Sequence, residues 1–223
     1  MYKRQLIDTE RENYTFSDEG GNLTVRNNIT GTLTISSNNV TVNIQNFNIQ
    51  NVNINNLIIN GNNVTVNIQN VNINTLSING SNFTLIGEGN CTIYTLLNNK
   101  PNTTIKYNIY INLLINNSLN LNIYTIKNIE NYIGQSSPDN ANSDDTTKNP
   151  ISMIHNGPGK INNILLSNFS RIMLNNRNHT TTSINMKNFS SVVINGNYTI
   201  YYTNLINYTI DKDANVELIK INE

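Results

Sequence analysis

Two carboxylates in the regular part of the chain, Glu88 and Glu130, are the first candidates for catalysis. Glycoside hydrolysis needs two carboxyl groups at a fixed separation, and a polysaccharide lyase needs a bound cation and a base. No Asp accompanies these two residues between positions 20 and 130. We therefore interpret them as isolated solvated charges and predict a non-enzymatic protein without catalytic residues.

Metal-binding residue types are sparse. Asp139, Asp144 and Asp145 lie in a polar segment, and oxygen-rich loops can bind Ca²⁺, but their spacing is not that of an EF-hand. His155 and His179 are far apart, and His155 is expected to be an exposed loop histidine. A single cysteine excludes an intrachain disulfide and a cysteine-based metal site. We expect no metal ion and no cofactor.

Three further features have structural explanations. Cys91 precedes an apolar alternation and is expected to be a small buried residue. The Gly157-Pro158-Gly159 segment predicts a turn, because the lysine and hydroxyl of a phosphate loop do not follow it. Tyrosines near the C-terminus are either interface residues or exposed strand residues: Tyr198, Tyr201, Tyr202 and Tyr208.

The charge balance excludes several classes of partner. The 223 residues contain 14 Lys and Arg and 14 Asp and Glu, so the net charge is zero. A neutral chain has no long-range field to attract nucleic acid or an anionic membrane. No run of 18 apolar residues is present, so we expect no membrane span. The first ten residues lack the apolar core of a secretory signal, so none is expected.

Asparagine dominates the composition for a structural reason. The chain has 52 Asn and 33 Ile but only 9 Lys, whereas an AT-rich coding sequence would raise Lys as well. Asn tolerates left-handed backbone conformations in turns. Stacked Asn side chains also hydrogen-bond to one another along a β-stack.

Period-two alternation of apolar and polar residues predicts half-buried strands. Residues 40–44 read Val-Thr-Val-Asn-Ile, and the same alternation recurs at 47–49, 52–54, 71–73 and 76–78. The strands themselves repeat: residues 38–46 return at 62–70, a shift of 24, and residues 51–61 return at 70–80, a shift of 19. Residues 168–174 match 188–194 with a shift of 20. This self-similarity indicates a solenoid.

The connections select the kind of solenoid. They are two to four residues long and include the turn dipeptides Asn60-Gly61, Asn79-Gly80 and Asn195-Gly196, which leaves no room for helices. The sequence therefore predicts an all-β parallel β-helix with coils of about 19–24 residues, Asn-rich turns and a core of Ile, Val and Leu. Residues 1–14 are expected to form an N-terminal arm or cap. Residues 15–223 are expected to form one solenoid domain, interrupted by a polar loop at about 134–160.

On this repeat pattern, residues 20 to 210 resemble the right-handed parallel β-helix proteins, a group that includes pectate-lyase-like enzymes, phage tail spikes and bacterial surface proteins. Residues 47–61 also show a local period of five, similar to that of pentapeptide-repeat proteins. That family has a small residue where this chain has the bulky Phe47, Val52 and Leu57.

These observations favour a structural protein that assembles with itself into a filament, an appendage or an outer layer of a virion, spore or cell. A charged N-terminal arm could join a neighbour by strand addition. The expected location is extracellular or on the surface of a particle, and the expected partner is the protein itself. The alternative is a carbohydrate-binding or polysaccharide-cleaving β-helix, such as a tail-spike or adhesin module, with surface glycans as partners.

Overall fold

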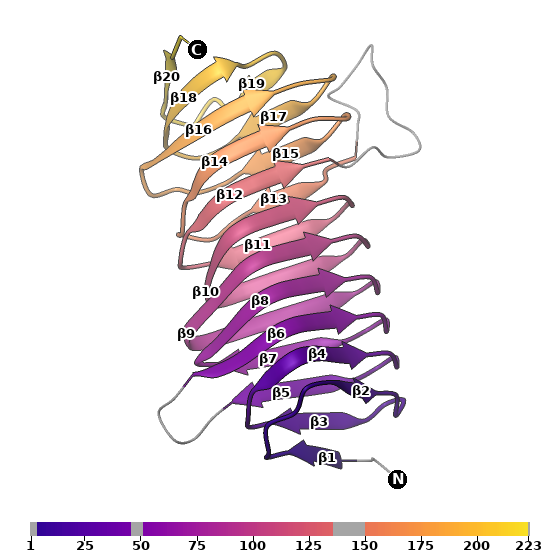
Figure 1. Cartoon of the computed structure of the whole chain (residues 1–223). Coiled ribbons are helices and arrows are strands. Elements are labelled where there is room, and N and C mark those ends of the chain that lie inside the picture. Colours follow the sequence, from indigo (N-terminus) through magenta and orange to yellow (C-terminus); the bar gives the residue numbers. More distant parts are fainter. Residues whose placement is uncertain (1–3, 46–50, 136–149, 223) are drawn as a thin grey trace.

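The computed structural model describes residues 4–45, 51–135 and 150–222. All regular secondary structure in these ranges is β-strand, and the strands wind into a parallel β-solenoid of about 10 turns. The two termini lie at opposite ends of the stack (Figure 1). The expected fold class is therefore confirmed.

Parallel pairing organises the coils into two ladders, and β9 and β10 run through both. The first ladder contains β1 (Arg4–Ile7), β3 (Asn22–Val25), β5 (Thr41–Gln45), β7 (Thr65–Gln69), β9 (Phe83–Asn98), β10 (Thr103–Asn116), β11 (Leu121–Thr125), β13 (Met153–His155), β15 (Arg171–Leu174), β17 (Ser191–Ile194) and β19 (Tyr208–Ile210). The second ladder contains β2 (Tyr14–Phe16), β4 (Ile29–Ile35), β6 (Val52–Ile59), β8 (Val71–Ile78), the C-terminal halves of β9 and β10, β12 (Ile129–Gly134), β14 (Ile161–Leu166), β16 (Thr180–Met186), β18 (Tyr198–Asn204) and β20 (Val216–Lys220).

Coil length is nearly constant apart from two long coils. Asn side chains on neighbouring coils pair across 18, 19 or 20 residues. The spacing rises to 24 in the coil that contains residues 46–50, and to 32 in the coil that contains residues 136–149. Both long coils return the strands to the same register, so the ladders continue through them.

The second ladder bends at a corner, which explains the local period of five. In β6, Val52 and Ile54 point inward, Asn55 and Asn56 both point outward, and Leu57 and Ile59 point inward again. The extra outward residue turns the chain, so inward pairs recur after five residues. Each coil therefore has one side in the first ladder and two shorter sides in the second.

The core is a set of apolar columns along the solenoid axis. Val42, Val66 and Leu85 occupy one column on three successive coils, and none of them is exposed. Burying each such side chain contributes about 1.5–3 kcal/mol. The inward Ile, Val and Leu residues therefore stabilise the stack as the alternation predicted.

Asparagine has two roles in the turns that precede the first ladder. Asn39, Asn63, Asn82, Asn102 and Asn120 all have positive φ, between 55° and 63°. Their side chains form a hydrogen-bonded column in which each Nδ2 donates to the Oδ1 of the preceding coil, at 2.9–3.0 Å. A lysine could satisfy neither requirement, because it has no acceptor and disfavours this backbone conformation.

Replacing Asn82 with alanine should therefore remove two contributions at once. The variant loses two side-chain hydrogen bonds and places a less suitable residue at φ 58°. We expect a loss of about 1–2 kcal/mol in the free energy of unfolding, measured with chemical denaturant. Asn82→Gly keeps the backbone conformation and should lose less, so equal losses would contradict a role for φ.

Two segments that were predicted to lie outside the regular coils contain strands. Residues Arg4–Ile7, within the segment for which an arm or cap was predicted, form β1 and pair with β3. Strand β13 lies inside the predicted interruption at 134–160 and pairs with β11 and β15. The interruption was therefore drawn too long at its C-terminal end, because a three-residue strand gave too short an alternation to detect. Residues 136–149 lie outside the described residues.

Candidate interaction surface

The structure does not bring the two candidate carboxylates together. Glu88 is exposed at the end of the first ladder, where it pairs with Gln69. Glu130 lies in β12, and its Oε2 accepts a hydrogen bond of 2.6 Å from Asn162 Nδ2. The two residues thus occupy different corners of the coil, two coils apart.

No group of three or more His, Cys, Asp or Glu side chains in residues 4–45, 51–135 and 150–222 could hold a metal ion. Asp139, Asp144 and Asp145, the candidate Ca²⁺ ligands, lie outside these ranges.

The expectation for His155 was wrong. His155 is the last residue of β13, points into the core between Ile123 and Leu174, and is only 1% exposed. Its Nε2 has no hydrogen-bond partner among the described residues. Burial lowers the pKa of the imidazole from 6.5 to about 4. His155 is therefore a neutral core residue at physiological pH.

Cys91 is buried, as expected, and is not exposed at all. Its thiol donates to the backbone carbonyl of Glu88 at 3.0 Å. Burial raises the pKa of the thiol, so the nucleophilic thiolate is disfavoured. This cysteine has the character of a core residue.

A buried polar network was not anticipated from the sequence. Asn98 and Asn116 replace apolar residues in an inward column, and both are fully buried. Asn98 Nδ2 donates to Asn116 Oδ1 at 2.8 Å, and Asn116 Nδ2 donates to Tyr132 Oη at 3.1 Å. Thr103 Oγ1 donates to Asn98 Oδ1 at 2.8 Å. Because these groups satisfy one another, the network is structural and offers no free group to a ligand.

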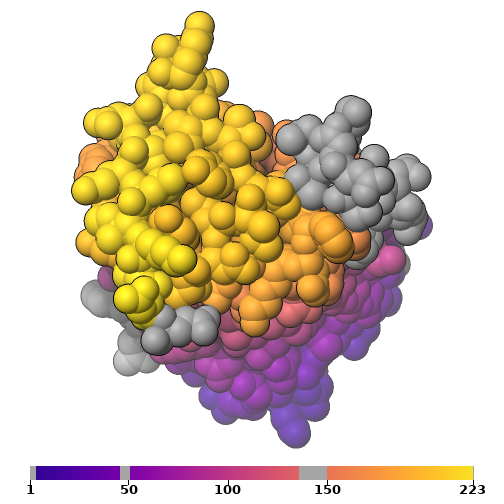
Figure 2. Space-filling view, turned by 90° about the horizontal axis from the view of Figure 1, so that it is seen from above, coloured from indigo at the N-terminus to yellow at the C-terminus, as the bar shows by residue number. Residues whose placement is uncertain are grey.

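The C-terminal tyrosines divide into two kinds. Tyr198 belongs to the core, and its hydroxyl accepts a hydrogen bond of 3.1 Å from the Asn176 backbone N–H. Burial raises the Tyr198 pKa to about 12. Tyr201 and Tyr208 are 37% and 47% exposed. Figure 2 shows the last coils, coloured yellow, covering the C-terminal end of the stack.

A polar groove of about 530 Å³ lies at the turns that follow β13, β15 and β17. Its lining includes the column Asn156, Asn175 and Asn195, which is joined by side-chain hydrogen bonds of 2.7 and 3.0 Å. Arg177 also lines it and is exposed. Amide and guanidinium groups of this kind can bind hydroxyl and carboxylate oxygens.

The most extended feature is an uncharged surface on the second ladder, which we call the uncharged flank. It consists of two outward columns that continue in register from β4 to β16. The polar column is Thr32, Asn56, Thr75, Thr95, Leu113, Asn131, Asn163 and Ser183. The apolar column is Thr34, Ile58, Ser77, Leu97, Ile115, Ile133, Leu165 and Asn185.

Large aliphatic side chains face solvent on this flank. Ile58, Leu97, Ile115, Ile133 and Leu165 are all half-buried, although they project away from the core. Asn163 is exposed, and the remaining members of both columns are half-buried. None of the sixteen residues carries a charge. A shallow depression of about 390 Å³ lies over the flank and is lined by Leu113, Ile133 and Leu165, among others.

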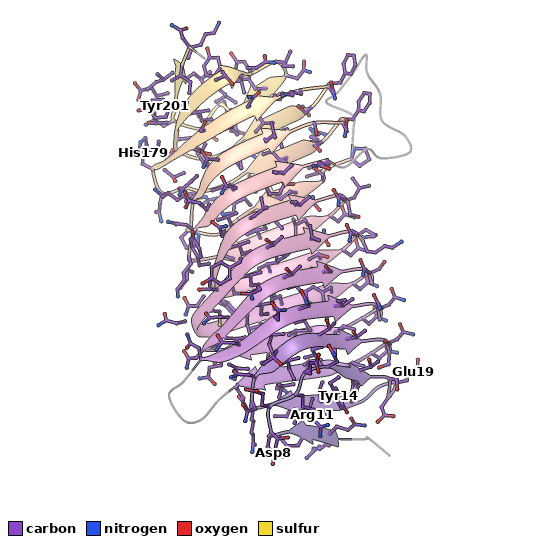
Figure 3. The ribbon with its side chains drawn as sticks, viewed as in Figure 1. Asp8, Arg11, Tyr14, Glu19, His179 and Tyr201 are labelled. Carbon is purple, nitrogen blue, oxygen red and sulfur yellow. The ribbon has the colours of Figure 1, made fainter. Side chains whose placement is uncertain are left out.

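Charges gather near the ends of the stack instead. Residues 8–19 contain five carboxylates and one arginine, and Figure 3 places Asp8, Arg11 and Glu19 at the N-terminal end. Residues 160–187 contain four cations and no carboxylate: Lys160, Arg171, Arg177 and Lys187. An acidic segment thus lies at the N-terminal end and a basic segment lies on and around β14 to β16, with Asp211, Asp213 and Glu217 on the coils beyond it.

Within the ranges that the structure describes, no helix is long and apolar enough to cross a bilayer. Comparisons with protein-family models, with curated proteins and with solved structures found no match to this chain.

Proposed function

We propose that this chain is a structural protein that associates with copies of itself to build a filament, an appendage or an outer layer of a virion, spore or cell. The observation that supports this function is the uncharged flank. Five aliphatic side chains face solvent along one line, on a surface without charge. Apolar patches of this kind often mark sites of contact with other proteins.

Lysine at two central positions of the apolar column should abolish self-association. In Leu97→Lys/Ile115→Lys, association would bury two charged groups without partners, which is strongly unfavourable. Both side chains project outward, so the fold should be retained. We expect assembled particles of the unmodified protein and dispersed monomers of the variant, by electron microscopy and light scattering.

The matched control is Thr65→Lys/Thr84→Lys, which adds the same charge to adjacent outward positions of the first ladder. This control should assemble normally. Loss of assembly in both variants would show that net charge, and not the flank, controls association.

Carbohydrate binding is a second candidate, and the polar groove supports it. The Asn156, Asn175 and Asn195 amides keep further donors and acceptors that can bind sugar hydroxyls, and Arg177 adds a cation. A glycan panel tests it: binding that Arg177→Gln weakens by tenfold or more would support this function. No binding by the unmodified protein would exclude it for the glycans tested.

A further inference from the structure

We propose that two copies of this chain pair side by side and antiparallel, with their uncharged flanks face to face. This inference rests on the proposed self-association and specifies its geometry. The partner is a second copy, and the contact is isologous, since the same surface is used by both copies. An isologous contact closes at two copies, so this pair is the building block of the proposed assembly, and a filament or layer needs a second contact between pairs.

The apolar column has a midpoint through which a two-fold axis can pass. Its aliphatic residues extend from Ile58 on β6 to Leu165 on β14, and Leu97 and Ile115 lie at the middle. A two-fold axis parallel to the strands, between Leu97 and Ile115, places Ile58 of one copy opposite Leu165 of the other. The partner's Ile58 then faces the depression that Leu165 and Ile133 line.

Charge complementarity selects the antiparallel orientation. With that axis, the turn that contains Asp18 and Glu19 and the turn that contains the partner's Lys187 lie about one coil spacing, ~5 Å, apart along the solenoid axis and ~10 Å apart across the interface. The resulting separation of about 11 Å is comparable with the Debye length of about 8–10 Å, so the attraction is weakened by salt but not abolished. In a parallel pair, by contrast, the acidic segment 8–19 of one copy would face the acidic segment of the other, and the two basic segments 160–187 would also face each other. Both contacts would bring like charges together.

The size of the flank reaches the minimum for a specific contact. Eight strands spaced ~4.8 Å apart give a length of about 38 Å, and four residues along each strand give a width of about 13 Å. Each copy would therefore bury roughly 500 Å², or roughly 1,000 Å² in total, which reaches the lower limit of specific interfaces.

The last coils also expose apolar side chains, such as Ile206 and Tyr208, but charged residues lie at both ends of the stack. Strand edges are protected from uncontrolled pairing when charged residues occupy them. Asp8, Glu10 and Glu12 lie next to the first strands, and Asp211, Lys212 and Asp213 lie next to the last ones. These charges favour contact through the side of the solenoid.

Paired cysteines test both the surface and the orientation. Asn56 and Asn163 lie in the polar column on the same strands as Ile58 and Leu165, so the apolar column remains intact. In the antiparallel pair, position 56 of one copy faces position 163 of the other, ~10 Å away. Two copies of the same position lie five coils apart along the axis, about 24 Å. A short bismaleimide cross-linker can span only the first distance.

We expect the double variant Asn56→Cys/Asn163→Cys to give covalent dimers and each single variant to give none. Dimers from each single variant would overturn the antiparallel orientation in favour of a parallel pair. If the unmodified protein associates but none of the three variants cross-links, the flank is not the interface. That result would leave the proposed function intact. A strictly monomeric unmodified protein would overturn both proposals.

Two controls complete the experiment. The unmodified protein contains only Cys91, which is fully buried, and provides the background of the reaction. Asn43→Cys/Met173→Cys places the same pair of thiols at half-buried positions on β5 and β15 in the first ladder. If this control cross-links as efficiently as the flank pair, the dimers come from random collisions between molecules, and the inference is overturned.

Discussion

Gly61→Ala is expected to lower the free energy of unfolding by about 3 kcal/mol or more, or to prevent folding. A Cβ at this position would lie 1.7 Å from the backbone oxygen of Ser37 on the coil before it. The same contact recurs one coil later, where a Cβ on Gly80 would lie 1.8 Å from the Gly61 oxygen. Because both obstacles are backbone atoms of the stacked turns that follow β4 and β6, the coils would have to separate, and such overpacking is strongly destabilising.

Denaturant unfolding of the variant measures this loss, and Gly20 provides the control. Gly20 has a φ of 64° but no atom within 4 Å of an added Cβ. Asn39, Asn63 and Asn82 occupy the equivalent turn position on later coils with similar φ values. Gly20→Asn should therefore change stability by less than about 1 kcal/mol. An unaltered unfolding midpoint for Gly61→Ala would contradict the close stacking of these turns.

Acid should destabilise the protein through His155. The folded-state pKa of about 4 lies below the unfolded value of 6.5, so between these values only the unfolded chain binds the proton. The free energy of unfolding should then fall by about 1.4 kcal/mol per pH unit as the pH decreases, by about 3 kcal/mol in total near pH 4. Above pH 6.5 both states are neutral, and this contribution to the pH dependence disappears.

His155→Leu isolates this effect, because leucine and isoleucine already occupy the neighbouring positions of the column at Leu174 and Ile123. The variant should be as stable as the unmodified protein at pH 7 and should lose the decrease between pH 6.5 and 4. His179 is exposed, so His179→Gln should retain that decrease. Equal pH profiles for the unmodified protein and His155→Leu would show that His155 is not the cause.

Sequence periodicity was sufficient to predict the architecture, because a solenoid repeats its local pattern on every coil. The matched segments at 38–46 and 62–70 pair residue by residue in β5 and β7, as the shift of 24 implies. The Asn-Gly turns were located correctly, but for an incomplete reason. Gly61 and Gly80 are required by the approach of the preceding coil, whereas Asn63 and Asn82 adopt the left-handed conformation.

The burial of His155 was missed because its strand is short and follows a long polar segment. One signal could have found it: His155-Asn156-Gly157 corresponds to Ile194-Asn195-Gly196, where the first residue points inward. The buried Asn98 and Asn116 were missed for a related reason, since single polar residues replaced apolar ones in an otherwise regular column.

The uncharged flank could not be predicted from the sequence alone. Its aliphatic residues follow one another at intervals of 39, 18, 18 and 32 residues, because Ser77 interrupts the column and residues 136–149 lengthen one coil. The strand register is needed to place Ile58 and Leu165 on the same line as Leu97, Ile115 and Ile133. Local alternation gives the direction of each side chain but not its neighbour on the next coil.

Sedimentation velocity of the unmodified protein over a wide range of concentration tests the central claim most directly. The uncharged flank predicts that the sedimentation coefficient rises with concentration from that of a 25.1 kDa monomer to that of larger species. Moderate salt should not abolish this rise, since burial of Ile and Leu provides most of the free energy of association. A sedimentation coefficient of the monomer at every concentration would contradict a self-associating structural protein.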